Sequence, residues 1–94
     1  MSQSSAPIPV LTLKPQEQEN TYKFNGQLYI TRGFESEFGD IAHALAFLAV
    51  NRIVNEIVKV KGGADYLQVF KCNGKRFWAI DDIDHITILL PSEY

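Results

Sequence analysis

The strongest constraint on the fold is a pair of strand-like segments, residues 65–72 and 75–81, separated only by Asn73-Gly74. An Asn-Gly pair readily adopts the two positive φ angles of a type I′ turn, whose twist matches that of two antiparallel strands. Pairing the strands outward from this turn places Phe70 opposite Phe77. The chain is therefore predicted to contain a β-hairpin whose register is set by local turn chemistry.

A third strand-like segment, residues 85–90, follows a short acidic turn. Side chains alternate between the two faces of a strand, so a shift of one residue in register exchanges the faces. We predict a three-residue turn that places Asp81 opposite His85 and Trp78 opposite Ile88, because this register gathers the isoleucines on the Trp78 face. A helix is expected to cover that face.

The predicted helix spans residues 41–59. Asp40 is a suitable N-cap, since its carboxylate can accept the unpaired amide hydrogens of the first turn, and Gly62-Gly63 ends the helix. Polar residues cover less than half of its circumference, so the helix either lies deep against a sheet or also meets a partner. Upstream, residues 21–32 predict a second hairpin with Asn25-Gly26 as its turn.

These patterns predict an α+β fold, with the order β-hairpin, helix, β-meander. We expect an antiparallel β-sheet of four to five strands with one long α-helix packed on one face. A chain of 94 residues is long enough for one small domain, which we assign to residues 21–94. Residues 1–20 are rich in Ser, Pro and Gln and are expected to form a flexible segment, although residues 10–14 have the pattern of an edge strand.

Composition narrows the classes of function. The net charge of −2 argues against strong nonspecific binding to nucleic acid. The single Cys72 has no partner for an internal disulfide, which fits a reducing compartment, and its basic neighbours predict a lowered thiol pKa. No signal peptide is evident, and the longest apolar stretch, residues 41–50, is shorter than a bilayer span. We expect a soluble cytoplasmic protein with no membrane contact and no cofactor.

The predicted register leaves an apolar face on the uncovered side of the sheet. The residues expected to form an interface there are Tyr29, Tyr66, Phe70, Phe77 and Leu89. Exposed apolar patches of this kind usually mark interaction sites. We expect a homodimer or a protein partner to cover this face; the alternative is that the apolar residues of the N-terminal segment fold back over it.

The acidic turn is a second candidate site. Asp81, Asp82, Asp84 and His85 have side chains able to bind a divalent cation, and a cross-strand Asp81–His85 pair would suit a general base. Aspartates also dominate turns for a structural reason, because their carboxylates bond nearby backbone amides. The sequence leaves both interpretations open.

Basic residues offer a third candidate, for anion binding. Arg32 lies at a strand end beside a glycine, and Lys71, Lys75 and Arg76 lie around the tip of the predicted hairpin. A single-stranded nucleic acid would require such cations interleaved with aromatic rings. Because these residues lie mostly at the tip, we do not expect nucleic acid to be the main partner.

Three segments resemble a small uncharacterised family found in Gram-positive bacteria and their phages. They are Tyr29-Ile-Thr-Arg-Gly33, Asp65-Tyr-Leu-Gln-Val-Phe70 and the stretch from Ile80 to Tyr94. Members of that family show Y-x-T-R-G, a helix, D-Y-L-Q-V-F and a C-terminal I-D-D-x-D-H-x-T-x-L-L-x-x-E-Y. The end of the chain is also similar to a second uncharacterised bacterial family. The resemblance implies a shared fold and carriage on mobile elements, but it implies no activity.

We therefore expect a small non-enzymatic binding or accessory protein that acts through protein–protein contacts and forms a homodimer. A metal-dependent or acid–base enzyme centred on the acidic turn is one alternative. A nucleic-acid adaptor that uses the basic hairpin tip is another.

Overall fold

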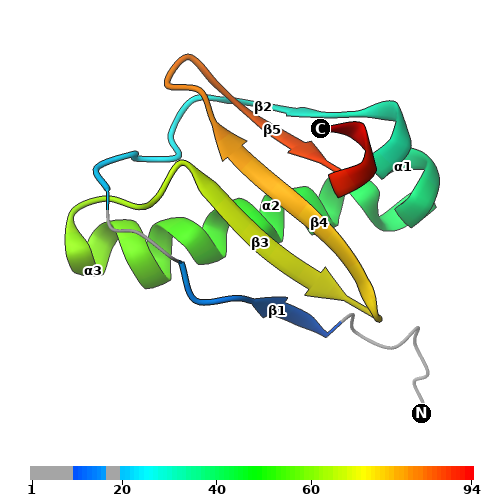
Figure 1. Ribbon diagram of the computed structural model, residues 1–94, viewed down its shortest axis with the longest axis horizontal. Helices are drawn as coiled ribbons and strands as arrows, with labels where there is room; N and C mark the ends of the chain where they lie inside the picture. The colour runs from blue at the N-terminus through cyan, green and yellow to red at the C-terminus, as the bar shows by residue number, and fades with distance from the viewer. Residues whose placement is uncertain (1–9, 17–19) are drawn as a thin grey trace, which may run out of the picture.

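A computed structural model describes residues 10–16 and 20–94, and in them the predicted α+β class is confirmed. One five-stranded sheet has the order β1-β3-β4-β5-β2, and a long, irregular helix crosses behind it (Figure 1). The strands are β1 Leu11–Leu13, β2 Gln27–Ile30, β3 Leu67–Cys72, β4 Lys75–Asp81 and β5 His85–Leu89. Of the segment 1–20 that was expected to be flexible, residues 1–9 and 17–19 lie outside the described residues, whereas residues 11–13 form β1 and belong to the sheet.

The helical region is built from several consecutive pieces. They are α1 Arg32–Phe38, a 3₁₀ turn at Gly39–Ile41, α2 Ala42–Ile53, a π-helical segment at Val54–Val58 and α3 Lys59–Lys61. A further 3₁₀ turn, η3, spans Pro91–Glu93 after the last strand. The helix is thus longer than predicted at its N-terminal end.

The β3–β4 hairpin has the predicted register. Asn73 and Gly74 have φ values of 51° and 81°, as a type I′ turn requires, and Phe70 pairs with Phe77. Because two adjacent residues fix this turn, the pairing follows from the sequence alone.

The predicted hairpin at residues 21–32 is not formed. β2 instead pairs in parallel with β5, with Tyr29 opposite Thr87. In this segment the positive φ lies at Phe24 (50°) rather than at Asn25 or Gly26. Gly26 allows its segment to pass close to the β4–β5 turn, since a Cβ there would lie 2.9 Å from the carbonyl oxygen of Asp84.

The helix begins at Thr31 rather than at Asp40. The Thr31 hydroxyl accepts a hydrogen bond from the Phe34 amide at 3.2 Å and caps α1. Asp40 lies inside the 3₁₀ turn that follows the break at Gly39, whose φ is 59°. The predicted end is confirmed, because Gly62 adopts the left-handed conformation that terminates α3.

The β4–β5 turn differs from the prediction by one residue in register. Asp81 lies opposite Ile86, and Trp78 lies opposite Leu89. Asp82 donates its amide to the carbonyl oxygen of His85 at 2.9 Å and closes the turn. This shift moves the isoleucines of β5 to the other face of the sheet.

The helix consequently covers the Phe70–Phe77 face, not the predicted Trp78 face. Phe70 and Phe77 are 0% exposed and stack with ring centroids 5.2 Å apart, and Phe34 meets Phe77 edge-on at 5.1 Å. The buried positions of α2 are mostly small, and they are Ala42, Leu45, Ala46, Ala49 and Ile53. Small helical residues allow the helix to approach large phenyl rings closely, which explains the choice of face.

By length and composition alone, the helical stretch Arg32–Lys61 of 30 residues is apolar enough to cross a membrane. The sequence-based expectation that no segment reaches the length of a bilayer span considered only the apolar run at residues 41–50, and the helix extends well beyond that run. Core helices of globular domains pass the same test, and here Leu45 and Ile53 pack in the core against the sheet.

Candidate functional site

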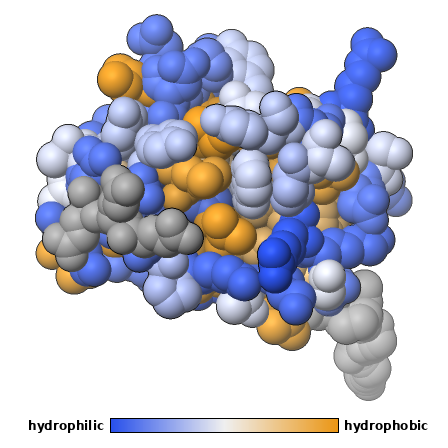
Figure 2. Space-filling view, in the orientation of Figure 1, coloured by the Kyte–Doolittle hydropathy of each residue, from blue (hydrophilic) through white to orange (hydrophobic). Residues whose placement is uncertain are grey.

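The helix-free face of the sheet carries a half-buried apolar surface. Figure 2 shows hydrophobic side chains gathered in the middle of this face, with hydrophilic residues around them. Trp78 and Ile80 of β4 occupy its centre, paired with Leu89 and Thr87 of β5. We call this surface the open face.

A pocket of about 450 Å³ lies at one end of the open face. Its lining combines apolar, aromatic and acidic side chains: Tyr22, Tyr66, Ile80, Asp81, Asp82, Ile83, Thr87, Leu89, Glu93 and Tyr94. Three tyrosines therefore surround a floor built from the open face. We call this cavity the tyrosine pocket.

Two of the tyrosines are positioned by a bridge between distant segments. Tyr22 and Ala64 exchange backbone hydrogen bonds of 3.0 and 2.8 Å, and the rings of Tyr22 and Tyr66 lie 6.1 Å apart. Gly63 permits this approach, because a Cβ there would lie 2.4 Å from the Cα of Thr21. The Gly-Gly pair thus ends the helix and also lets the segment around Tyr22 approach and form this wall.

Asp81 connects the wall of the pocket to its floor. Asp81 is only 4% exposed. Its Oδ2 accepts a hydrogen bond from the Phe24 amide at 2.9 Å, and its Oδ1 accepts one from the Ile83 amide at 2.8 Å. Both oxygens are therefore engaged by backbone donors. This geometry supports the structural interpretation of the acidic turn.

The predicted metal set does not converge. Within residues 10–16 and 20–94, no group of three or more His, Cys, Asp or Glu side chains is arranged to hold a metal ion. The predicted Asp81–His85 pair is also wrong, because His85 instead contacts Asp82, with Nε2 and Oδ2 3.2 Å apart. Asp84 is exposed at the turn. The one-residue shift in register accounts for both differences.

A carboxylate from the end of the chain caps the first helix. Glu93 accepts hydrogen bonds from the Thr31 hydroxyl at 2.6 Å, the Leu90 amide at 2.9 Å and the Gly33 amide at 3.1 Å. The bond from Thr31, followed by those from the two amides, lowers the pKa of the Glu93 carboxyl. The ring of Tyr94 then meets Trp78 edge-on at 5.4 Å on the open face.

We call this arrangement of Glu93 and Tyr94 the C-terminal latch. The bond between Glu93 and Thr31 has no local signal in the sequence, although both residues lie inside the segments predicted to resemble the phage-associated family. The place of Tyr94 in that family's motif does predict that this residue packs back onto the domain. The contact of Tyr94 with Trp78 follows from the latch, because it brings the last residue back over the sheet.

The four candidate anion-binding residues do not form a single site. Lys71 and Arg76 lie opposite one another at the β3–β4 tip, and Lys75 pairs with Glu37 at 2.5 Å. Arg32 is exposed on the first turn of α1, where the amide of the next residue already bonds Glu93. None of the four lines the tyrosine pocket.

The proposed interface residues divide between surface and core. Tyr29 and Tyr66 are 49% and 41% exposed, whereas Phe70 and Phe77 are 0% exposed and Leu89 is 7% exposed. The expectation that the two phenylalanines look outward is wrong, because the helix covers their face. They contribute to the core and are not available to a partner.

Cys72 is also enclosed. Its thiol is buried and free, and burial raises its pKa, contrary to the lowered value expected from neighbouring lysines. Desolvation outweighs the lysines because these lie at exposed positions, where water screens their charge.

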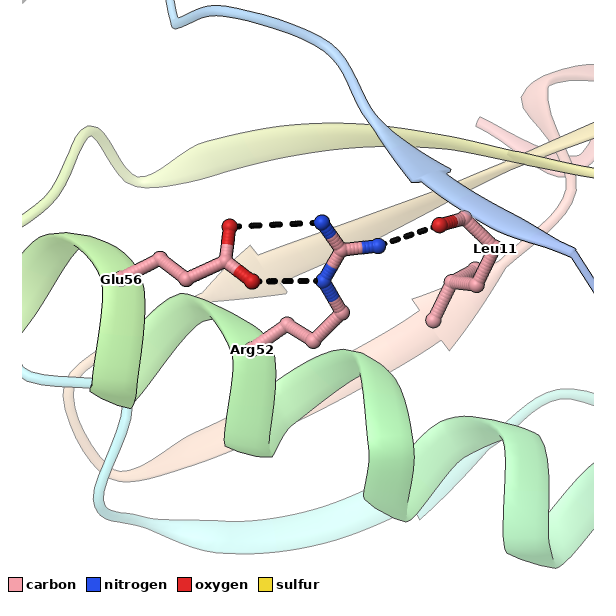
Figure 3. A network of polar contacts seen from close by, with 3 residues as sticks. All are labelled: Leu11, Arg52 and Glu56. Atoms are coloured by element: carbon pink, nitrogen blue, oxygen red, sulfur yellow. Dashed lines mark hydrogen bonds and ion pairs between the residues drawn. The ribbon is translucent and has the colours of Figure 1, made fainter.

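The N-terminal strand extends the sheet instead of covering the open face. β1 pairs with β3, with Leu13 opposite Phe70, so the predicted edge strand is confirmed. Arg52 of α2 holds it in place by donating to the carbonyl oxygen of Leu11, while its Nε lies 2.8 Å from Glu56 (Figure 3). This bond to Arg52 lowers the pKa of the Glu56 carboxyl.

Comparisons of the chain with protein-family models, with curated proteins and with solved structures found no match. The class that the structure defines is a small α+β domain with a helix on one sheet face and a tyrosine-lined pocket on the other. The resemblance to the phage-associated family stays a prediction.

Proposed function

We propose that this protein is a non-enzymatic binding module that holds a segment of a partner protein in the tyrosine pocket. The observation that carries this proposal is the pocket itself, whose volume of about 450 Å³ falls within the usual range of ligand sites. Tyrosines favour recognition because each ring offers a large apolar surface at a small cost in side-chain entropy.

The chemistry of the lining supports a partner segment with a basic residue next to an apolar one. Three lining residues carry carboxylates, Asp81, Asp82 and Glu93, and none of the lining residues is Lys or Arg. Clustered carboxylates raise the local concentration of cations, and the faces of aromatic rings attract them as well. The apolar part of the partner would rest on Ile80 and Leu89.

Binding accounts for these features better than catalysis does. Asp81, the most enclosed carboxylate of the lining, already accepts two backbone hydrogen bonds, so it has a structural role. The Asp82–His85 pair lies at the exposed end of the turn. The acidic pocket would repel a nucleic-acid backbone, which disfavours the adaptor alternative. The free thiol of Cys72 supports a cytoplasmic location.

The test is a selection from random peptides displayed on phage, with the purified protein as bait. Enriched peptides are expected to carry Lys or Arg beside an apolar residue and to bind with micromolar affinity. Ile80→Lys, which places a cation on the pocket floor, is expected to weaken them at least tenfold, or about 1.4 kcal/mol. Asp82→Asn is expected to weaken them less and to reduce the dependence on salt.

The matched control is Ser36→Lys on the exposed side of α1, which adds the same charge away from the pocket. Urea unfolding of each variant separates loss of binding from loss of folding. Enriched peptides that bind Ile80→Lys as tightly as the wild type would place recognition elsewhere. A selection that yields nothing above the background of an unrelated domain would overturn the proposal.

A further inference from the structure

The outer side of α2, remote from the sheet, is apolar. Phe47 is 63% exposed, Leu48 is 48% exposed and Ile41 is 39% exposed, with exposed Ala44 between them. At 3.6 residues per turn these positions form a single stripe. The core-facing residues Leu45, Ala49 and Ile53 lie on the opposite side of the same helix. The helix therefore presents two apolar sides, and the sheet covers only one.

From this stripe we infer that the protein forms a weak antiparallel homodimer through the outer side of α2, with the stretch from Phe47 to Asn51 at the twofold axis. The inference is independent of the proposed function, because the tyrosine pocket lies on the opposite face of the sheet.

Charge complementarity identifies a second copy as the occupant. The stripe begins near the exposed Asp40 and ends near the exposed Lys59, with neutral Ala44, Asn51 and Asn55 between them. An antiparallel pair brings Asp40 of each copy to the Lys59 end of the other, and it also opposes the helix dipoles favourably. A parallel pair would bring like charges together.

The π-helical segment Val54–Val58 contributes to this alignment. Its wider turn underwinds the helix, so the residues after it are rotated back relative to a regular α-helix, and Lys59 is carried toward the stripe. A regular helix would turn Lys59 away from Phe47. π-Segments are uncommon and frequently occur at functional sites.

The small size of the surface indicates a weak dimer. From Ala42 to Lys61 the helix is about 30 Å long and about 10 Å across, so its outer half presents roughly 470 Å². A standard interface buries about 800 Å² on each partner. The dimer is accordingly expected to dissociate in the range of about 10–100 μM.

Sedimentation equilibrium from about 5 to 500 μM is the first measurement, since it spans this range. Phe47→Glu is expected to remain monomeric throughout. Val10→Glu is the matched control, because Val10 is also apolar and 71% exposed but lies just before β1; it is expected to dimerise like the wild type. A wild type that stays monomeric, or a Phe47→Glu variant that still dimerises, would refute the inference.

A charge exchange tests the antiparallel arrangement separately. Lys59→Glu and Asp40→Lys each set like charges together at both ends of the homodimer and are expected to weaken it about tenfold. Mixing the two variants restores both attractive contacts, so the heterodimer is expected to form at wild-type strength. Failure of the mixture to associate would exclude this geometry.

A membrane surface is the competing occupant of the stripe. Vesicles of phosphatidylcholine with phosphatidylglycerol provide the probe in flotation with wild type and Phe47→Glu. No flotation of the wild type is expected. Flotation that Phe47→Glu abolishes, together with a monomeric wild type in solution, would assign the stripe to lipid and overturn the dimer.

Discussion

Removing the Asp81 carboxylate should destabilise the fold far more than removing any other carboxylate of the same turn. Asp81 is 4% exposed, and its two oxygens accept the amides of Phe24 at 2.9 Å and Ile83 at 2.8 Å. The bond from Phe24 joins the segment before β2 to the end of β4, and the bond from Ile83 holds the β4–β5 turn. Asp81→Ala leaves both amides without an acceptor.

The two amides differ in whether water can replace the lost acceptor. Phe24 is 1% exposed, so its amide is left buried without a partner, which costs about 1–3 kcal/mol. Ile83 is 72% exposed, so water can replace its lost acceptor at a cost of about 0.5–1 kcal/mol. The expected loss of unfolding free energy is about 3 kcal/mol, which lowers the melting temperature of a domain of this size by roughly 15 °C.

Urea unfolding followed by the fluorescence of Trp78, the single tryptophan, measures this loss directly. Asp81→Asn keeps one carbonyl acceptor and is expected to fall between Asp81→Ala and the wild type. Asp84→Ala removes an exposed carboxylate from the same turn and is expected to change stability by less than about 0.5 kcal/mol. Equal losses for Asp81→Ala and Asp84→Ala would refute the structural role assigned to Asp81.

Two further predictions concern the C-terminal latch and the Gly-Gly pair. Because the Glu93 pKa is lowered from 4.5, its carboxylate stabilises the fold above that value, and this contribution is lost as the pH falls through the lowered pKa. Glu93→Gln is therefore expected to be less stable than the wild type near pH 7 by no more than about 1 kcal/mol, since the site is exposed. Urea unfolding should show this gap closing as the pH falls below 4.5, and a constant gap would contradict this role. Gly63→Ala places a Cβ 2.4 Å from the Cα of Thr21 and is expected to cost more than about 2 kcal/mol, whereas Gly62→Ala, with φ at 87° and no atom within 4 Å, is expected to cost about 1 kcal/mol. Urea titration of the two variants checks their order, and a reversed order would show that Tyr22 and Ala64 do not need this close approach.

The sequence determines the features that depend on neighbouring residues. Asn73-Gly74 sets both positive φ angles of its turn, so the pairing of Phe70 with Phe77 could be predicted. Gly62 ends the helix for a similarly local reason, because glycine adopts a left-handed conformation at little cost.

The β4–β5 turn could not be predicted in the same way. Ile83 adopts a φ of 75°, which a β-branched residue rarely does, so no local pattern signals it. Once the register shifts by one residue, every conclusion about the faces of β5 is reversed. The unusual φ of one turn residue therefore accounts for the wrong prediction of the β5 register, of the core and of the exposure of Phe77.

The remaining differences depend on contacts between segments far apart in the chain. Thr31 is a modest N-cap on its own, and it has Glu93 as a partner because the pairing of β2 with β5 places the segment after β5 beside it. The candidate site also depends on a long-range contact. The hydrogen bond from the Phe24 amide to Asp81 holds the segment that carries Tyr22. Composition and periodicity contain no information on such pairs, which is why the pocket was not predicted although its acidic turn was.

The positions of the two proposed surfaces also bear on how they would act together. The helix lies on one face of the sheet (Figure 1), and the tyrosine pocket is lined by residues of the other face, so occupancy of one surface leaves the other open. A dimer joined through Phe47 would carry two outward-facing pockets, and a partner with two suitable segments would bind more tightly than a single segment does. Weak association at each surface is then sufficient for a stable complex with a repeated or oligomeric partner, while a single free segment exchanges rapidly.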